Sequence, residues 1–351
     1  MLSKGASKIK RLTAPAYEVD PEILRRYDQR NLIFNRVYMD PTFPAYGRTM
    51  EEKAYRNILE DRSGYTRLDY ALSEAAWTVH DAWGQWTSWK RIERPGGAGL
   101  FGGPVERAEV KDGSEMARVV KRAARFYGAS LVGITRVNPL WIYLNDRSLE
   151  PINLPEGVRT AIVIAIEMDE MGIATSPACP ASAATGLGYS KMAFVASTLA
   201  EFIRNLGYTA IPAGNDIALS IPLAVDAGLG QLGRNGLLIT PEYGPRVRLC
   251  KVLTDLPLKE DKPIDFGVTE TCKKCRACAE ACEAGAISMD PEPGWVPACS
   301  SNNPGVLKWY VNGEKCYEFW CENGVDCSTC IAVCPYNQGP KGASPEDFWR
   351  G

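Results

Sequence analysis

The cysteines of this chain are concentrated near its C-terminus, and their spacing is the strongest constraint on how the chain can fold. Ten of the twelve cysteines fall within residues 272–351. Four of them form a C-x2-C-x2-C-x3-C run: Cys272, Cys275, Cys278 and Cys282. Another four follow a gap: Cys316, Cys327, Cys330 and Cys334. A tight loop with two residues between successive thiolates can wrap one small inorganic body, so this end of the chain is expected to fold around metal.

This spacing is typical of two-cluster bacterial ferredoxins, here split by a long insertion. The fourth cysteine of such a run ligates the other cluster. We therefore predict two [4Fe–4S] clusters, one held by Cys272, Cys275, Cys278 and Cys334, the other by Cys282, Cys316, Cys327 and Cys330. Structural zinc sites pair C-x2-C units and rarely use a third cysteine at the next step. Pro335 fits the ferredoxin pattern, whereas Glu283 stands where proline is usual, which changes a turn and not a ligand.

Composition narrows the function further. A net charge of −2 gives no indication of a nucleic-acid partner. Arg25-Arg26 resembles a twin-arginine dipeptide, but no apolar stretch with a cleavage site follows it. We expect a cytoplasmic protein as the chain stands, or one at the exported face of the cytoplasmic membrane if a twin-arginine signal was removed. His80 is the single histidine, which argues against histidine-based zinc sites and Ser-His-Asp triads. We expect His80 to be a packed or surface helix residue.

The chain divides into three predicted segments: 1–113, 114–260 and 261–351, the last with a Pro/Asn/Gly-rich insertion at 290–315. The first is expected to be irregular and aromatic-rich, and to pack on the core. Its tryptophans, which form either core packing or a pocket wall, are Trp77, Trp83, Trp86 and Trp89.

The middle segment reads as alternating helices and strands. We expect a helix capped by Ser114 and running over 115–127, and a second helix over 189–205. The expected strands are 131–135, 160–167, 209–212 and 247–253.

A glycine pattern in this segment matches a dinucleotide fingerprint but lacks its context. Gly228, Gly230 and Gly233 form G-x-G-x-x-G, yet the preceding 221–226 reads as a helix and not as a strand. We do not expect NAD binding. The glycines indicate close backbone approach to something bulky or anionic.

Several stretches in order along the chain resemble the corrinoid-dependent reductive dehalogenases. With the cysteine runs they span about 115–340, and they are 188–190, 207–215, 227–231, 239–245, 247–249 and 262–270. The resemblance implies a mixed fold, α+β or α/β, with a nitroreductase-like core that buries cobalamin and a C-terminal ferredoxin-like domain that supplies electrons.

The resemblance also implies roles for individual residues. Tyr189 is expected to be the proton donor, Arg248 its cationic neighbour, and Asn215 a polar residue that orients the substrate. Trp320 is expected to be a pocket wall. Cofactor contacts are expected at Ser190, Gly228, Gly230, Gln231 and Gly233. A phenol keeps its proton near neutral pH, and a guanidinium stabilises the phenolate left after donation.

The implied activity is removal of halide from a small organohalide by cob(I)alamin, reduced through the two clusters by a low-potential electron donor. Cobalamin proteins that supply a lower histidine ligand use a D-x-H-x-x-G motif, which is absent here. We therefore expect a base-off corrinoid with no protein imidazole on cobalt. A small membrane-anchor protein is a possible partner.

Two alternatives remain open from the sequence. An epoxyqueuosine reductase would use the same corrinoid and clusters, but the 244–248 segment and the long insertion before Cys316 argue against it. A non-catalytic iron–sulfur electron carrier would have no use for the apolar middle segment or for Tyr189, Asn215 and Arg248.

Overall fold

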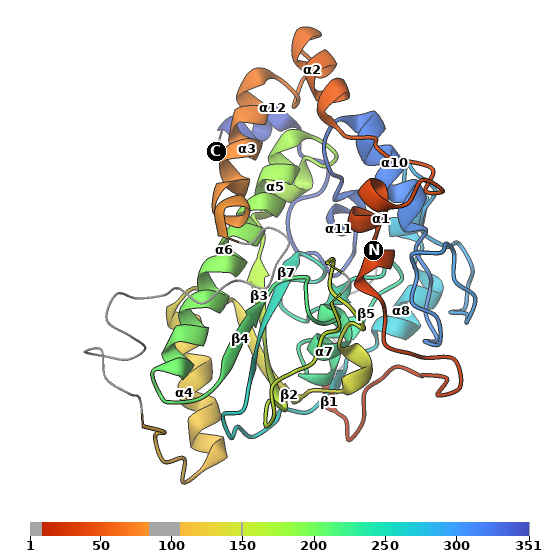
Figure 1. Ribbon diagram of the computed structural model, residues 1–351. Helices are drawn as coiled ribbons and strands as arrows, with labels where there is room; N and C mark the ends of the chain where they lie inside the picture. The colour runs from red at the N-terminus through yellow and green to blue at the C-terminus, as the bar shows by residue number, and fades with distance from the viewer. Residues whose placement is uncertain (1–8, 84–105, 149, 351) are drawn as a thin grey trace.

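A computed structural model describes residues 9–83, 106–148 and 150–350 of the protein (Figure 1). Its twelve α-helices in that part of the chain are α1 (Ile33–Met39), α2 (Glu51–Leu59), α3 (Arg67–Trp83), α4 (Gly113–Phe126), α5 (Glu170–Ala174), α6 (Cys179–Arg204), α7 (Ser220–Asp226), α8 (Val268–Lys274), α9 (Ala277–Glu280), α10 (Gly313–Asn323), α11 (Thr329–Ala332) and α12 (Pro345–Arg350). Its strands are β1 (Lys10–Arg11), β2 (Leu131–Arg136), β3 (Thr160–Glu167), β4 (Ala210–Ala213), β5 (Gln231–Leu232), β6 (Leu238–Ile239), β7 (Val247–Thr254) and β8 (Ile264–Asp265).

The main sheet has the strand order β2-β3-β7-β4, and all three pairings are antiparallel. The β3–β7 ladder runs from the Thr160–Thr254 pair to the Glu167–Val247 pair. Helices and strands are thus mixed as expected, in the α+β arrangement and not as parallel α/β units.

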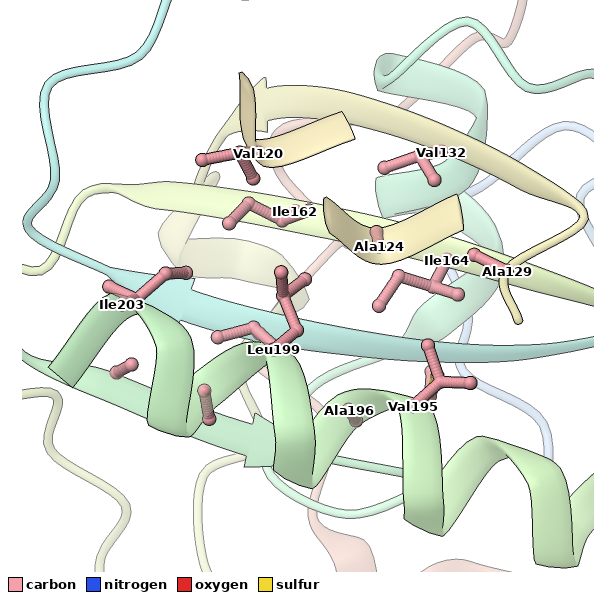
Figure 2. Packing of buried hydrophobic residues seen from close by; sticks show 14 of the residues in the cluster. Val120, Ala124, Ala129, Val132, Ile162, Ile164, Val195, Ala196, Leu199 and Ile203 are labelled. Carbon is pink, nitrogen blue, oxygen red and sulfur yellow. The ribbon is translucent and has the colours of Figure 1, made fainter. Parts of the chain in front are cut away.

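Both faces of the sheet are covered by helices. Successive side chains of a strand point to opposite faces, so alternate residues of β3 pack in two different clusters. Ile162, Ile164 and Ile166 of β3 pack with α4 and α6 on one face (Figure 2). Ala161, Val163 and Ala165 pack on the other face, where α7 lies. This explains why β3 reads as an almost continuous apolar run.

Helix boundaries differ from the sequence expectation at two places. The expected cap at Ser114 is wrong, because Asp112 is the N-cap and its side chain accepts a hydrogen bond from the Ser114 backbone N–H at 2.7 Å. Helix α6 starts at Cys179, ten residues before the expected start. The added stretch consists mainly of small residues and carries no apolar periodicity that could have predicted it.

The expected irregular N-terminal segment instead contains α1, α2 and α3. Figure 1 shows α3 lying along α6, and α2 near α10. Strand β1 pairs with β8, next to the first cysteine run. Trp86 and Trp89 lie outside the described residues, as does the side chain of Trp83.

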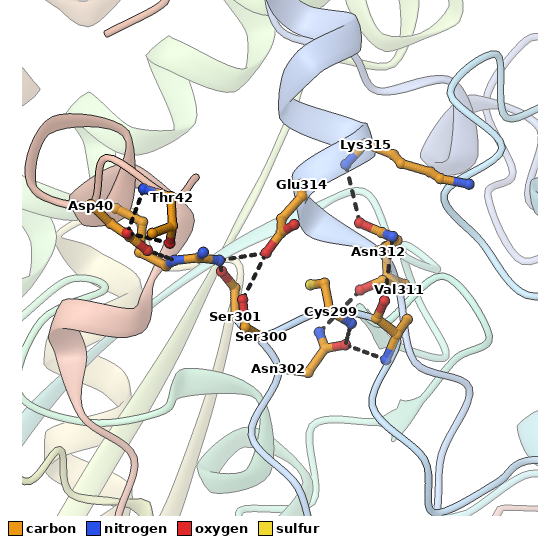
Figure 3. A network of polar contacts seen from close by, with 12 residues as sticks. Asp40, Thr42, Cys299, Ser300, Ser301, Asn302, Val311, Asn312, Glu314 and Lys315 are labelled. Atoms are coloured by element: carbon orange, nitrogen blue, oxygen red, sulfur yellow. Dashed lines mark hydrogen bonds and ion pairs between the residues drawn. The ribbon is translucent and has the colours of Figure 1, made fainter. Parts of the chain in front are cut away.

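A buried arginine, Arg36, joins this N-terminal segment to the insertion; Figure 3 labels three of its partners, Asp40, Ser301 and Glu314. Arg36 of α1 pairs with Asp40 at 2.8 Å, donates to Ser301 Oγ at 2.7 Å, and forms an ion pair with Glu314. A hydrogen bond therefore joins α1 to the insertion, and an ion pair joins α1 to α10. Among the residues that the structure describes, no helix is long and apolar enough to cross a membrane.

Leu199 on α6 is fully buried in the cluster of Figure 2. We expect Leu199→Ala to lower the free energy of unfolding by about 2–5 kcal/mol, because it removes buried apolar surface and leaves a cavity. Urea unfolding followed by circular dichroism checks this. The matched control is Leu187→Ala on the same helix, where the side chain is 42% exposed and the change should stay within about 0.5 kcal/mol. Equal losses in the two variants would contradict this assignment of the core.

Candidate active site and iron–sulfur centres

The structure brings the three predicted catalytic residues together from three different elements. Tyr189 lies in α6 and is half-buried. Its phenol oxygen accepts a hydrogen bond from Nδ2 of Asn215, in the loop after β4, at 2.9 Å. The guanidinium carbon of Arg248, on β7, lies 5.2 Å from the centre of the Tyr189 ring. A phenol, an amide and a cation therefore share one location.

Two aromatic side chains of α3 complete the surroundings of Tyr189. The Trp77 ring stacks on it with centroids 5.0 Å apart and planes at 22°. The His80 ring meets it edge-on at 5.2 Å. The His80 backbone N–H donates to Ser190 Oγ at 3.2 Å. The sequence leaves Trp77 open between core packing and a pocket wall, and it predicts His80 to be a packed or surface helix residue. Their spacing of three residues puts both on one helix face.

Two glycines of α6 make room for these neighbours. A Cβ at Gly186 would lie 2.5 Å from the Trp77 ring, and a Cβ at Gly188 would lie 2.9 Å from Cγ of Arg248. Glycine costs helix stability relative to alanine. Close approach of Trp77 on one side and Arg248 on the other explains why it occurs here.

The two arginines near the start of β7 have different environments. Arg246 is 3% exposed and bonds Glu167 at 2.7 Å, the Met168 carbonyl at 2.5 Å and Asn337 at 3.1 Å. It fastens the edge of the sheet to the C-terminal segment. Arg248 donates to Thr185 Oγ1 at 3.1 Å, and its buried Nε has no hydrogen-bond partner within the described residues. Arg248 is thus the arginine that faces Tyr189.

A buried lysine holds the loop that carries Asn215. Lys251 is 0% exposed, and its ammonium donates to the carbonyls of Gly214 and Ala218 at 2.5 and 2.6 Å and to Ser220 Oγ at 3.0 Å. Burial lowers the pKa of Lys251 to about 8, although the nearby Asp216 raises it. Ile217, in the same loop, has a φ of +66°, which is strained for a β-branched residue. The ammonium therefore compensates for an otherwise unfavourable loop.

The remaining predicted pocket and cofactor residues contact protein groups. Trp320 of α10 packs on Phe34 at 5.7 Å and on Tyr317 at 6.2 Å, and its buried Nε1 has no partner in the described part of the chain. Ser190 Oγ donates to the Ala76 carbonyl at 2.6 Å. Gln231 Oε1 accepts from the Phe266 N–H at 2.8 Å.

The three glycines of the G-x-G-x-x-G pattern approach other parts of the chain closely. A Cβ would lie 2.3 Å from the Lys262 carbonyl oxygen at Gly228, and 2.1 Å from that of Ile239 at Gly230. At Gly233 it would lie 2.8 Å from the Ile239 side chain. Their role as cofactor contacts, like that of Ser190 and Gln231, stays a prediction. The preceding 220–226 is helical, so the context of a dinucleotide site is absent there.

The first predicted cluster has a pocket whose walls include all four of its cysteines. The residues that line it are Arg234, Asn235, Ile239, Thr271, Cys272, Cys275, Cys278, Cys334, Pro335 and Tyr336. Burial raises the pKa of the Cys278 thiol to about 12, and the neighbouring Cys272 and Cys334 add to the shift. Iron binding requires the thiolate forms of these cysteines.

The four cysteines of the second set also lie near one another. Burial raises the pKa of Cys316 to about 12, with further contributions from Cys327 and Cys282. Burial also raises the pKa of Cys330, with further contributions from Cys327, Cys316, Cys278 and Cys282. Backbone N–H groups of Ala286 and Thr329 point at the sulfurs of Cys282 and Cys327, each at 3.4 Å. Such bonds stabilise thiolate ligands.

The chemistry of the two donor sets fits iron–sulfur clusters, because four cysteine thiolates are the ligands of a [4Fe–4S] cluster. In residues 9–83, 106–148 and 150–350, no three His, Cys, Asp or Glu side chains are arranged to hold one metal ion.

The second set of cysteines is connected to the Tyr189 site. Ser328, next to Cys327, lies with its Oγ 3.4 Å from Thr185 Oγ1, which accepts a hydrogen bond from Arg248. Asp326 is buried there; burial raises its pKa, while bonds from Ser182 and the charge of Arg248 lower it. A short polar chain therefore leads from the second cluster's ligand loop to the phenol.

Comparisons with known proteins give the family of the chain and the class of its C-terminal domain. A 4Fe-4S dicluster domain model matches residues 271–338. The tetrachloroethene reductive dehalogenase of Sulfurospirillum multivorans is 34% identical over 92% of this chain and 69% of that protein. The chain belongs to the reductive dehalogenase family. A tetrachloroethene reductive dehalogenase of Desulfitobacterium hafniense is 41% identical, over 64% of this chain and 48% of its own length.

The chain spans about half the length of several curated family members that it matches. Among solved structures, the catabolic reductive dehalogenase NpRdhA aligns with a TM-score of 0.72 at 24% identity, over 94% of this chain and 44% of that one. That likeness concerns the fold. It confirms the expected mixed architecture with a C-terminal iron–sulfur domain.

Removal of the Lys251 ammonium tests how the Asn215 loop is held. We expect Lys251→Met to lower the free energy of unfolding by about 3 kcal/mol, because two carbonyls lose their donor and the buried Asp216 loses a compensating charge. Denaturant unfolding checks this. Lys191→Met, at an exposed position of α6, is the control and should be nearly neutral. A small effect at Lys251 would show that the loop does not depend on it.

Replacement of one ligand tests the division of the cysteines into two sets. We expect Cys316→Ser to reduce the iron content from roughly eight to roughly four atoms per chain after anaerobic reconstitution, since one cluster loses a thiolate. Cys299→Ser removes a cysteine assigned to neither set and should keep the full iron content. Iron and sulfide analysis measures both variants. Full iron in the Cys316 variant would refute the assignment.

Proposed function

We propose that this chain carries out reductive dehalogenation, in which an organohalide is reduced at a corrinoid and Tyr189 protonates the carbon product. The observation that supports this most directly is the hydrogen bond from Asn215 to the Tyr189 phenol oxygen, with Arg248 beside the same ring. Family membership gives the class of reaction. The contacts of these three residues give each of them a role in it.

The proton transfer follows from the hydrogen-bond direction. The Tyr189 oxygen accepts from the Asn215 amide, so its own hydrogen is free to point at a substrate. Once that proton leaves, Asn215 continues to donate to the phenolate oxygen, and Arg248 supplies positive charge next to the ring. Both contacts favour the deprotonated product more than the neutral phenol, so they assist donation.

A corrinoid, when bound, supplies the strongly reducing metal that cleaves the carbon–halogen bond. We propose that a nitroreductase-like core holds it base-off, with no protein imidazole on cobalt. The buried donors Nε of Arg248 and Nε1 of Trp320 have no partner among the described residues, so they are available to amide groups of a corrinoid. His80, the single histidine of the sequence, packs edge-on against the Tyr189 ring.

For the electron path, we propose entry at the Cys272 cluster and transfer through the Cys316 cluster. The contact of Ser328 with Thr185, which in turn bonds Arg248, puts the second ligand loop next to the catalytic residues. A low-potential donor outside the chain would reduce the first cluster. A membrane-anchor partner remains part of the proposal.

The proposed substrate is a small, unsaturated or aromatic halide. Trp77, His80 and Tyr189 form one aromatic cluster around the proposed proton donor, and flat apolar molecules pack well beside aromatic side chains. Tetrachloroethene is the first compound to test, because it appears in the names of the two relatives described above.

Tyr189→Phe keeps the ring and removes the proton. After anaerobic reconstitution with cobalamin, iron and sulfide, we expect halide release with reduced methyl viologen to fall by at least about 100-fold, while corrinoid absorption per chain is retained. Tyr55→Phe, on the exposed face of α2, is the matched control and should release halide at the normal rate.

The outcomes separate the alternatives. Unchanged turnover in Tyr189→Phe would refute the proton-donor role. Corrinoid binding without halide release from any substrate would favour epoxyqueuosine reduction. A protein that binds iron–sulfur clusters but no corrinoid would be an electron carrier.

A further inference from the structure

One buried cation near the iron–sulfur centres has no role in the function proposed above. Arg234 lies in the turn between β5 and β6 and is only 1% exposed. It makes all its hydrogen bonds to backbone carbonyls: two to Cys272 at 3.1 and 2.7 Å, and one each to Ser288 and Asp290 at 2.7 Å. The Trp309 ring covers the guanidinium, with the ring centre 4.5 Å from its carbon.

This charge has no carboxylate partner among the residues that the structure describes. Each of the ion pairs found there involves other side chains. Asp290 meets Arg234 only through its backbone carbonyl, and its carboxylate accepts a hydrogen bond from Ser288 Oγ. Glu292, two residues further along the chain, pairs with Lys273. A buried guanidinium that lacks a counter-charge is costly, since carbonyl dipoles replace only part of its hydration. The fold therefore retains a net positive charge at this point.

The negative charge that matches it is expected in the adjacent pocket. Arg234 lines the same pocket as Cys272, Cys275, Cys278 and Cys334. Four thiolates outweigh the charge of an iron–sulfur core, so the cluster is anionic, and it gains one further negative charge on reduction.

We propose that Arg234 tunes the cluster held by Cys272, Cys275, Cys278 and Cys334 by raising its reduction potential above that of the same cluster without the buried cation. A fixed positive charge stabilises the reduced cluster more than the oxidised one. Because the guanidinium is shielded from solvent, salt screens it little. The contacts of Arg234 are with the ligand loop of the first cluster, so its effect on the second cluster is smaller.

This inference rests on the iron–sulfur part of the proposed function and not on corrinoid chemistry or halide release. A higher potential at the first cluster makes that cluster easier to reduce from outside, and it also makes the reduced cluster a weaker electron donor to the cluster beside the Tyr189 site.

The chain offers a second cation for comparison. Lys341 also donates to the backbone carbonyl of a ligand of this cluster, Cys334, at 2.7 Å. Lys341 is exposed, so water and salt screen its charge. Removal of either charge breaks hydrogen bonds to a ligand carbonyl, but only removal of Arg234 takes away a buried charge.

The test is a redox titration of the full chain reconstituted with iron and sulfide, in which reduced clusters are followed by electron paramagnetic resonance. The variants are Arg234→Gln, Arg234→Met, Arg234→Lys and Lys341→Gln, each checked first for iron content. For the two neutral Arg234 variants we expect a roughly tenfold lower ratio of reduced to oxidised first cluster at a fixed potential, about 59 mV for one electron. Arg234→Lys keeps the charge and should stay near the wild-type potential, and Lys341→Gln should shift much less.

Three results would overturn the proposal. The first is an unchanged potential in both neutral variants. The second is an equal shift in Arg234→Lys, which would mean that geometry matters and charge does not. The third is loss of the first cluster's iron in both neutral variants, which would make Arg234 a structural clamp. A failure of halide release in the wild-type protein would bear on the proposed function alone, since the potentials are measured without substrate or corrinoid.

Discussion

The antiparallel pairing of β3 with β7 is the constraint on which the candidate active site depends. It fixes the register of β7, in which Ile166 lies opposite Arg248 and Val163 opposite Lys251. Residues an odd number apart point to opposite faces of a sheet. Arg248 therefore points to the α6 face, where it meets Tyr189 and Thr185, while Lys251 points to the other face and holds the 214–220 loop. A slip of one residue would exchange these faces and separate the cation from the phenol.

Helix α6 connects the sheet to the iron–sulfur domain. Its C-terminal part fills the apolar core with Leu199 and Ile203. Its N-terminal part is built from small residues that allow Trp77, Arg248 and the 326–329 segment to approach closely. The same helix thus serves as core and as the wall of the site. The polar chain from Ser328 through Thr185 to Arg248 couples the second ligand loop to the residues around the phenol.

Positive charges recur where negative charge is expected to develop. The half-buried Arg248 accompanies a phenol that would become a phenolate, and the buried Arg234 accompanies a cluster that would gain an electron. Arg246, by contrast, pairs with Glu167 and has a structural role. Arg246 and Arg248 lie two residues apart, yet they differ in role because their neighbours in the fold differ. The sequence spacing alone could not distinguish them.

The sequence by itself determined the local features whose physics depends on neighbours along the chain. The cysteine spacing predicted the ferredoxin-like domain, the apolar run 160–167 predicted β3 with its bounds, and motif order along the chain indicated the family. Tertiary structure alone decided which distant residues meet. The place of Trp77 and His80 beside Tyr189, the start of α6 at Cys179, the capture of the Asn215 loop by Lys251 and the burial of Arg234 against a cysteine pocket all depend on contacts between elements far apart in sequence. Such contacts follow from packing and charge compensation in three dimensions, and neither periodicity nor spacing records them.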